Sequence, residues 1–332
     1  MMRALALLIA SIALVAAVPN PDAAVAAAQQ AIWASFAARD PVAARAPALA
    51  RLRLLAKGPG RTALAARALL LKWGSASDAT LAWSGLMAQH RDDPALAPVL
   101  EANWEGSALP EAKARLAALV ASTRSRAVAG SGRLLLARAD LAAGRRAPAL
   151  ATLAAVARDY PDVTTTMLGA GTPPRLATVA QGISFRETAL QPGAPLPAIR
   201  VQDLAGRPAD TTVLRGRPVL IDFWATWCPP CVAALPRVAA LHRAHADLAV
   251  VSISADDDRA TVQRWLRRHP EPWIQWWMGR SGRVSTRWLN SDYPFYVVAG
   301  RDGRIIGTTN RIADAKALVA RASVQATKPT AR

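Results

Sequence analysis

Cysteine, histidine and lysine are scarce in this chain of 332 residues. Two cysteines are too few for a cysteine-rich zinc site, and the four histidines lack ligand spacing with them, so no metal is expected. Lysine occurs only five times among the 41 basic residues, so arginine supplies nearly all of the net charge of +18. Because alanine is also abundant, this pattern is typical of a GC-rich coding bias, and no nucleic-acid partner is predicted.

Two cofactor signatures are missing as well. The chain has no glycine-rich phosphate loop, and Val232 rather than histidine follows Cys231, which excludes a haem-attachment motif. No cofactor is therefore expected.

Long apolar runs are rare, and one lies at the N-terminus. Met1–Arg3 carries a positive charge and Ala4–Val18 is apolar. A run of about 15 residues is shorter than the roughly 20 needed to span a bilayer. Residues 1–18 are therefore predicted to be a cleaved signal peptide, with an uncleaved membrane anchor as the alternative. The expected location is an oxidising compartment, namely a bacterial periplasm.

Residues 23–185 are rich in alanine and leucine and predict an all-α domain. Arg133–Ala143 and Ala147–Arg158 form a helix pair broken at Gly144, and this unit resembles a tetratricopeptide repeat. Thr62–Trp73 and Asp78–His90 form a similar pair. The breaks at Gly74 and Gly144 are 70 residues apart, about twice the 34-residue repeat. A plain helical bundle is the alternative.

Residues 163–195 predict a linker with a short helix near Pro174–Gln181, and residues 190–326 predict an α/β domain followed by a loose tail at 327–332. Strands are expected at Ile199–Gln202, Thr211–Leu214, Val219–Trp224, Leu248–Ser254, Trp273–Met278, Phe295–Ala299 and Arg304–Thr308. Helices are expected at Pro230–Ala246, from Asp256–Asp258 to Arg268, and at Ala313–Gln325.

The two cysteines, Cys228 and Cys231, end an apolar run that predicts a buried strand. A disulfide between residues three apart closes a very small loop, so it stabilises the fold little. The pair is better explained by chemistry. A strand followed by Cys-X-X-Cys and a helix is the layout of a thiol–disulfide exchange site.

The second half resembles the thioredoxin superfamily, and within it the periplasmic TlpA/ResA-type thioredoxins. The likeness is carried by Gly193–Pro197, by Leu214–Cys231 and by Arg301–Ile306. The resemblance implies a thiol–disulfide oxidoreductase that reduces protein substrates with cysteine pairs, some of them in cytochrome c maturation. It also implies a membrane electron donor. The helical half is interpreted as an added module that binds a protein partner.

The resemblance assigns roles to the motif. Cys228 is expected to be the exposed attacking sulfur at a helix N-terminus, where free N–H groups and the helix dipole stabilise a thiolate. Cys231 is expected to be the buried sulfur that resolves the mixed disulfide. Pro229 and Pro230 suit the first helical turn, which does not need their missing N–H groups, and they are expected to limit substrate approach.

Asp222 matches the buried acid of the thioredoxins, six positions before Cys228. Burial should raise its pKa and allow it to exchange a proton with Cys231 through water. The alternative is a structural aspartate held by an arginine or by backbone donors.

Two further elements are expected to contact substrate. Tyr293-Pro294 precedes a predicted strand, where the superfamily places a cis-proline loop facing the disulfide. A bulky Tyr293 departs from the small residue that is common there, which affects substrate selectivity. Trp227 is expected to shield the sulfurs and contact substrate, whereas Trp224 is expected to pack in the core.

Two alternatives to the reductase remain open. The same motif serves disulfide oxidants and isomerases, because direction depends on thiolate stability. In a third interpretation the protein is a scaffold whose helical domain carries the function, although a pure scaffold would not need the cysteine pair.

Overall fold

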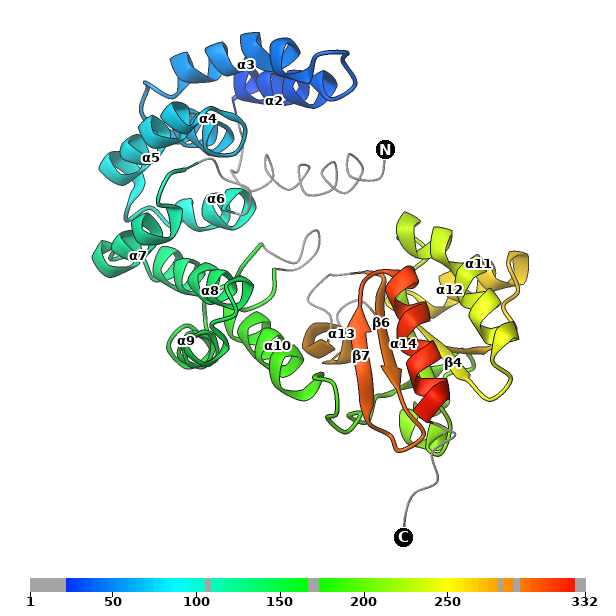
Figure 1. The fold of residues 1–332 in the computed structure, drawn as a ribbon. Helices are drawn as coiled ribbons and strands as arrows, with labels where there is room; N and C mark the ends of the chain where they lie inside the picture. Colours follow the sequence, from blue (N-terminus) through cyan, green and yellow to red (C-terminus); the bar gives the residue numbers. More distant parts are fainter. Residues whose placement is uncertain (1–21, 105–108, 167–172, 280–282, 289–292, 326–332) are drawn as a thin grey trace. The chain divides into compact units, whose positions relative to one another are not determined.

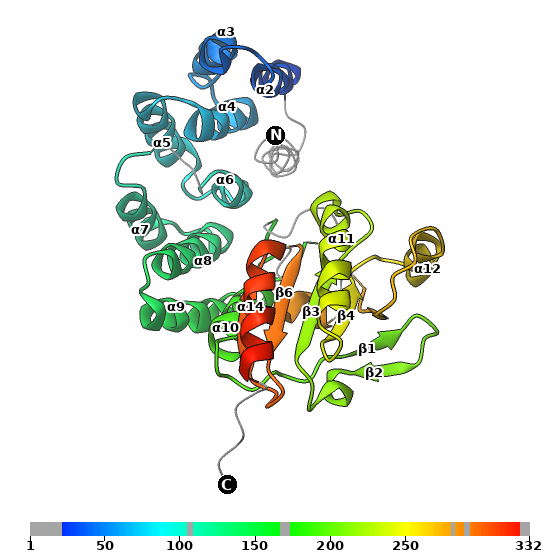
Figure 2. The same ribbon diagram turned by 45° about the vertical axis from the view of Figure 1, so that its right-hand side comes forward.

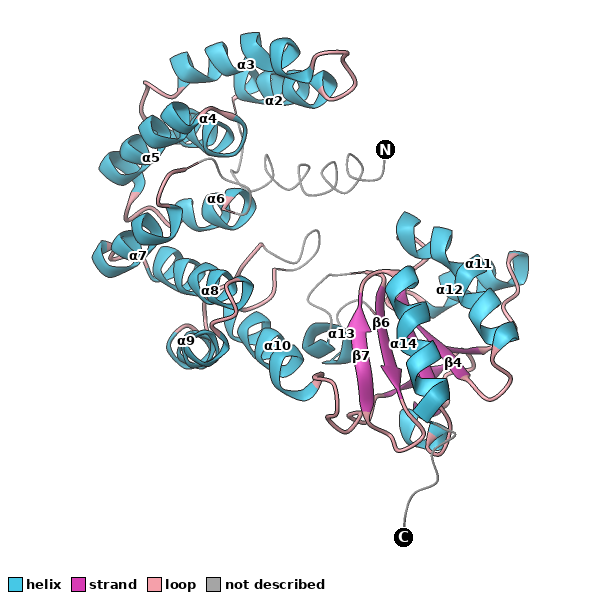
Figure 3. Ribbon diagram, in the orientation of Figure 1, coloured by secondary structure: helices cyan, strands magenta, loops and turns pink. Residues whose placement is uncertain are grey.

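The computed structural model describes residues 22–104, 109–166, 173–279, 283–288 and 293–325. The chain divides near residue 180 into two compact units. The first unit is all-helical, and the second is an α/β unit in which helices pack on a mixed β-sheet (Figures 1 and 3). The predicted fold class is confirmed, whereas the predicted signal peptide and C-terminal tail lie outside the described residues.

The first unit is a succession of antiparallel-packed helices. Neighbours along the chain pack most closely as α2 with α3, α4 with α5, and α8 with α9. Helices of this unit are α2 (Ala23–Ser35), α3 (Pro41–Leu55), α4 (Gly60–Trp73), α5 (Ala76–His90), α6 (Leu96–Asn103), α7 (Ala112–Ser122), α8 (Arg126–Ala142) and α9 (Arg146–Asp159). The two helix pairs predicted from the sequence are thus present as α4/α5 and α8/α9. Their identity as tetratricopeptide repeats stays a prediction.

Local signals explain where these helices begin and end. Gly144 follows α8 with a φ of 74°, a backbone conformation that glycine adopts without strain, so the chain can turn back into α9. Ser75 caps α5 in a reciprocal capping box with Asp78. Arg53 of α3 donates two hydrogen bonds to the same carboxylate, at 2.7 and 2.8 Å. Asp78 therefore joins α3 to the start of α5.

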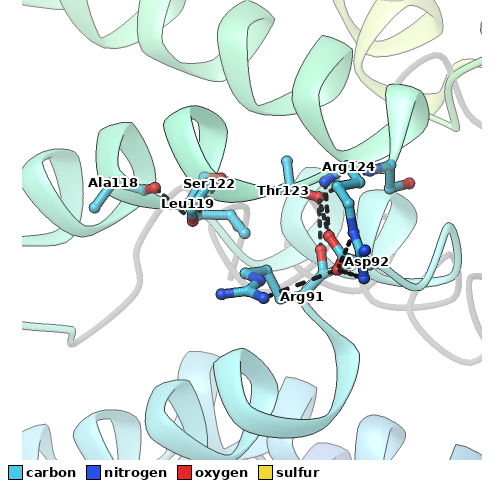
Figure 4. A network of polar contacts seen from close by, with 8 residues as sticks. Arg91, Asp92, Ala118, Leu119, Ser122, Thr123 and Arg124 are labelled. Carbon is cyan, nitrogen blue, oxygen red and sulfur yellow. Dashed lines mark hydrogen bonds and ion pairs between the residues drawn. The ribbon is translucent and has the colours of Figure 1, made fainter.

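A second polar cluster joins the loop after α5 to the loop before α8 (Figure 4). The carboxylate of Asp92 accepts hydrogen bonds from the backbone N–H of Arg124 at 2.7 Å and from its guanidinium at 3.2 Å. Thr123 Oγ1 donates to the carbonyl of Arg91 at 2.8 Å. These contacts tie the loop after α5 to the loop before α8.

The segment predicted as a linker contains a longer helix than expected. Helix α10 covers Leu176–Ala189, beyond the predicted end at Gln181. The prolines lie on both sides of this helix, and Gly182 inside it does not interrupt it. Burial of Leu176, Val179 and Ala180 supplies the packing that the helix needs.

The second unit contains a seven-stranded sheet in the order β2-β1-β5-β4-β3-β6-β7. The strands are β1 (Arg200–Asp203), β2 (Pro208–Asp210), β3 (Val219–Trp224), β4 (Ala249–Ser254), β5 (Ile274–Trp277), β6 (Phe295–Ala299) and β7 (Ile305–Thr309). Strand β3 lies between β4, to which it is parallel, and β6, to which it is antiparallel. All six residues of β3 are buried, as its near-continuous apolar run predicts.

Helices of the second unit are α11 (Pro229–Ala244), α12 (Arg259–Arg268), α13 (Arg283–Trp288) and α14 (Ile312–Gln325). Helices α11 and α14 lie side by side over one face of the sheet (Figures 1 and 2). The aromatic rings of Phe223, Phe295, Trp288 and Phe185 pack together in the same unit.

One predicted strand is wrong. Thr211–Leu214 forms a 3₁₀ helix, η1, and the strand that pairs with β1 is Pro208–Asp210. The side chain of Asp210 accepts a hydrogen bond from the N–H of Thr212 at 2.8 Å, which favours a helical turn over a continued strand.

None of the helices in the described part of the chain is both long and apolar enough to cross a bilayer.

The contacts of Asp78 lead to a stability prediction. Asp78→Ala should lower the free energy of unfolding of the helical unit by about 2 kcal/mol, because it removes a helix cap and an arginine partner from a buried position. Arg53 holds the pKa of Asp78 below its usual range, so this stabilisation is present at neutral pH and declines as pH falls below about 4. Urea unfolding of the full chain, followed by circular dichroism, measures the change.

Asp40→Ala is the matched control, because Asp40 caps α3 from an exposed position and has no ion pair among the described residues. It should cost about 1 kcal/mol at most. Equal losses in the two variants would contradict the role given to the Arg53–Asp78 pair.

Candidate redox site

The cysteine pair lies where β3 ends and α11 begins. Cys228 is the N-cap residue of α11, and Cys231 lies in its first turn. The two sulfurs form a disulfide. The N–H of Cys231 also donates to Cys228 Sγ at 3.3 Å. Cys228 therefore lies at the helix N-terminus, where the N–H of Cys231 and the helix dipole favour a negatively charged sulfur, since Pro229 and Pro230 have no N–H.

The disulfide is less exposed than the sequence suggested. Cys228 is 5% exposed and Cys231 is 2% exposed, so the expectation of an exposed Cys228 is wrong for this oxidised form. Its sulfur is bonded to that of Cys231 and accepts the N–H of Cys231. Pro229 and Pro230 occupy the first helical turn, as expected, and both are exposed.

An aromatic pair lies at the site. Trp227, which precedes the first cysteine, is 44% exposed. Its ring meets that of Tyr293 edge to face, with centroids 5.7 Å apart. The Tyr293–Pro294 peptide bond is cis, as predicted. The fold therefore brings together Trp227 and Tyr293, which are far apart in the sequence.

Trp224, in contrast to Trp227, packs in the core. It is 1% exposed, and its ring packs edge to face on Trp265 with centroids 5.0 Å apart. Trp273, Trp276 and Trp288 are buried as well. Most of the tryptophan cluster of this unit is therefore core.

Asp222 belongs to a row of polar residues that crosses the sheet. It lies directly opposite Ser252 of β4 and Tyr296 of β6, and Ser252 lies opposite Gln275 of β5. Asp222, Ser252 and Tyr296 are each at most 1% exposed. Because directly paired residues share a face of a sheet, the row places polar groups side by side within an apolar core.

Two hydrogen bonds lead from Trp273 through Ser252 to Asp222. Trp273 Nε1 donates to Ser252 Oγ at 2.8 Å, and Ser252 Oγ donates to Asp222 Oδ2 at 2.9 Å. The serine hydroxyl has one hydrogen, and the bond from Trp273 leaves that hydrogen for Asp222. Within the described residues no arginine or lysine forms an ion pair with Asp222, so the alternative of an arginine-held aspartate receives no support.

Burial raises the pKa of Asp222 from its ordinary value of 3.8 to about 7. The hydrogen bond from Ser252 opposes this rise, and the charge of Glu271 adds to it. Burial, together with the nearby Asp222, also raises the pKa of Tyr296. A carboxyl group that titrates near neutral pH can both accept and donate a proton under physiological conditions.

Three residues that organise the site were not predicted from the sequence. Ser252 and Trp273 orient Asp222, and Asp256 holds the turn before the cysteines through hydrogen bonds from Thr226. A signal was present in the polar Ser252 and Ser254 of an otherwise apolar strand. Asp256 was interpreted only as part of a helix cap, a role that Asp258 performs.

The described residues contain no group of three or more histidine, cysteine, aspartate or glutamate side chains arranged to hold a metal ion.

Comparison with known proteins shows which families and proteins this unit resembles. The sequence model of the family described as Redoxin matches residues 191–321. The chain is 36% identical over 75 residues to the thioredoxin-like protein YneN of Bacillus subtilis, covering 22% of this chain and 44% of that protein. It is 37% identical over 85 residues to the thiol:disulfide interchange protein DsbE of Yersinia pestis, covering 25% and 44%.

A third relative is the thiol-disulfide oxidoreductase ResA of Bacillus cereus, 27% identical over 94 residues, with 28% of this chain and 54% of that protein covered. The chain thus spans about half the length of the curated relatives it matches. Among solved structures, the thioredoxin domain of a Bacteroides vulgatus thiol-disulfide oxidoreductase is similar, at 21% identity and a TM-score of 0.35, covering 39% of this chain and 99% of that one.

The fold and the site together define the class. The second unit is a thioredoxin-superfamily domain with a Cys-X-X-Cys disulfide at a helix N-terminus. Residues 191–321 of this unit match the Redoxin family model, and the similarities to DsbE and ResA support the TlpA/ResA-type resemblance seen in the sequence.

The environment of Asp222 predicts how stability depends on pH. A carboxyl whose pKa rises on folding holds its proton more tightly in the folded state, so stability is lost as pH increases from about 4 to about 7. Asp222→Asn cannot ionise. Relative to the natural protein it should gain stability between pH 5 and pH 8, by at most about 3 kcal/mol.

Denaturant unfolding of both proteins at the two pH values, followed by tryptophan fluorescence, measures this difference. Asp302→Asn, in the exposed turn before β7, is the control and should show no such pH-dependent gain. A constant stability difference between Asp222→Asn and the natural protein would contradict a carboxyl that titrates near pH 7.

Proposed function

We propose that this protein is an exported thiol–disulfide oxidoreductase that reduces disulfides of other exported proteins through Cys228 and Cys231. The observation that carries the proposal is the Cys228–Cys231 disulfide at the N-terminus of α11. The YneN, DsbE and ResA similarities support the reaction class. Reduction as the direction, a periplasmic location and service to cytochrome c maturation are finer parts of the same proposal.

The proposed reaction begins with the reduced pair. The Cys228 thiolate attacks one sulfur of a substrate disulfide. The substrate S–S bond breaks, a mixed disulfide forms, and the leaving substrate sulfur takes up a proton. The hydrogen bond from the Cys231 N–H and the helix dipole stabilise the attacking thiolate.

The second step resolves the mixed disulfide. Cys231 loses its proton, attacks Cys228 Sγ and displaces the second substrate sulfur. We propose that Asp222 accepts this proton through water, since the pKa of its buried carboxyl lies near neutral pH. Two electrons pass to the substrate and the pair ends as the disulfide. A membrane donor of two electrons is proposed to restore the dithiol.

The surroundings of the pair suit a protein substrate. Trp227 offers an exposed ring beside Cys228, and Tyr293 and Pro294 border it from the loop before β6. We propose that these residues, with Pro229 and Pro230, contact an extended substrate segment at its cysteine. The helical unit is proposed to bind a protein partner.

The reduction potential distinguishes a reductant from an oxidant. We expect a value near the thioredoxin level of about −270 mV, measured by equilibration with dithiothreitol and glutathione and read by tryptophan fluorescence. A value near about −120 mV would instead establish a disulfide oxidant. Cys228→Ser is the control and should show no redox transition.

The same control variant tests the scaffold alternative in cells. If catalysis is the function, Cys228→Ser should behave like a deletion of the gene. Full complementation by this variant would favour the scaffold.

The proton-transfer role of Asp222 has its own test. The rate of reduction of a protein disulfide should rise as pH passes through about 7, because Asp222 then becomes able to accept the proton of Cys231. Asp222→Asn should lower this rate about tenfold at pH 8 and remove the rise. Stopped-flow measurements from pH 6 to pH 9 provide the profile.

Ser252→Ala is the matched variant, because it keeps the acid and removes only its hydrogen bond. Loss of a donor to the charged form should move the midpoint of the profile to higher pH. An Asp222→Asn profile that coincides with that of the natural protein would refute proton transfer by Asp222.

A further inference from the structure

The turn that connects β3 to the cysteines is held by a side chain from the neighbouring strand. The carboxylate of Asp256, just after β4, accepts two hydrogen bonds from Thr226. The backbone N–H of Thr226 donates to Oδ2 at 3.0 Å, and its Oγ1 donates to Oδ1 at 2.5 Å. Thr226 lies two residues before Cys228, so the carboxylate clamps the turn immediately next to the reacting sulfur.

Asp256 is itself fixed in place. It is 1% exposed, and Ser254 Oγ donates to its Oδ2 at 2.7 Å. The backbone carbonyl of Asp256 accepts a hydrogen bond from Trp277 Nε1 at 2.7 Å. The strands on both sides of the contact are also joined, because the N–H of Ala255 donates to the carbonyl of Trp224 at 2.9 Å. The carboxylate therefore has a defined position relative to the end of β3.

A buried carboxylate is costly unless it is paired or hydrogen-bonded. Over the described ranges, no lysine, arginine or histidine lies within ion-pair distance of Asp256. Hydrogen bonds from Thr226 and Ser254 take the place of a cation. Packing alone does not explain a buried acid at this position, since an apolar residue of similar size would avoid the cost of desolvation.

The turn determines where Cys228 Sγ lies. The N–H of Cys228 donates to the carbonyl of Ala225 at 3.2 Å, and the sulfur accepts the N–H of Cys231. That second contact stabilises a thiolate only while the turn keeps the sulfur in line with the helix terminus. Thr226 is in the middle of this turn, and Asp256 holds it by both its backbone and its side chain.

We propose that Asp256 is a positioning residue of the redox site, which acts through Thr226 to keep Cys228 Sγ against the N-terminus of α11. This inference rests on the proposed function, because it gives Asp256 a part in the same exchange reaction. Asp256 does not touch the substrate. It sets the reactivity of the sulfur that does.

The test measures the reactivity of Cys228 directly. In the full-length chain with Cys231→Ser, Cys228 is the only thiol, and its rate of alkylation by iodoacetamide at pH 7 reports its thiolate fraction. Asp256→Ala should slow this rate about tenfold. Asp256→Asn keeps an acceptor for Thr226, so it should remain within about threefold of the parent.

Substitutions of Thr226 provide a second test of the same contact. Thr226→Ser keeps the hydroxyl donor and should leave the rate unchanged, whereas Thr226→Val should slow it about threefold. Combining Thr226→Val with Asp256→Ala should give no further loss, because the two residues act as one contact. Asp258→Ala is the matched control: it removes the cap of α12 but no contact with the turn, and it should leave the rate unchanged.

Several results would overturn the proposal. An Asp256→Ala rate equal to that of Asp258→Ala would show that Asp256 does not position the sulfur. A faster rate would show that its charge repels the thiolate instead. If Asp256→Ala fails to fold, as judged by circular dichroism, the Thr226 pair decides: a slow Thr226→Val with a normal Thr226→Ser supports the proposal, and equal rates refute it.

The measurement is independent of the proposed function. Alkylation requires no protein substrate. A parent protein that fails to reduce protein disulfides would refute the oxidoreductase proposal. The positioning role of Asp256 would still be tested by the alkylation rates.

Discussion

The junction between the end of β3 and the start of α11 is the constraint on which the redox domain depends. A buried strand delivers the chain to this point, and the helix, whose first two residues are prolines without an N–H, presents the N–H of Cys231 there. Cys228 lies between the two, so its sulfur shares the positive end of the helix dipole. The sheet order places β3 between β4 and β6, which bring the polar partners of the site.

Burial of polar groups is the second theme of the site. Asp222 and Asp256 are each almost fully buried and have no cationic partner among the described residues, but they differ in how many hydrogen bonds they accept. Among the described residues Asp222 accepts a hydrogen bond only from Ser252, and the pKa of its carboxyl rises to about 7. Asp256 has three donors from two residues. The first environment suits a group that exchanges protons, and the second suits a group that holds a turn.

The helical unit is built on different contacts. Its helices bury alanine and leucine faces against one another, and polar clamps such as Arg53–Asp78 and Asp92–Arg124 join successive pairs. Each helix pair therefore depends on its neighbour for part of its packing, as in stacked-helix proteins. This organisation agrees with an added module that binds a partner, which is the role proposed for it.

The amino-acid sequence by itself determined those features that depend on neighbouring residues: the helix pairs, the buried strand Val219–Trp224, the Cys-X-X-Cys at the next helix and the acid within the strand. Strand Thr211–Leu214 was wrong because a side-chain cap outcompeted the β-pattern. Only the tertiary structure decided which polar groups meet, since Ser252 and Asp256 reach Asp222 and Thr226 across 30 residues. Sheet register sets those pairings, and register depends on long-range packing that no local pattern records.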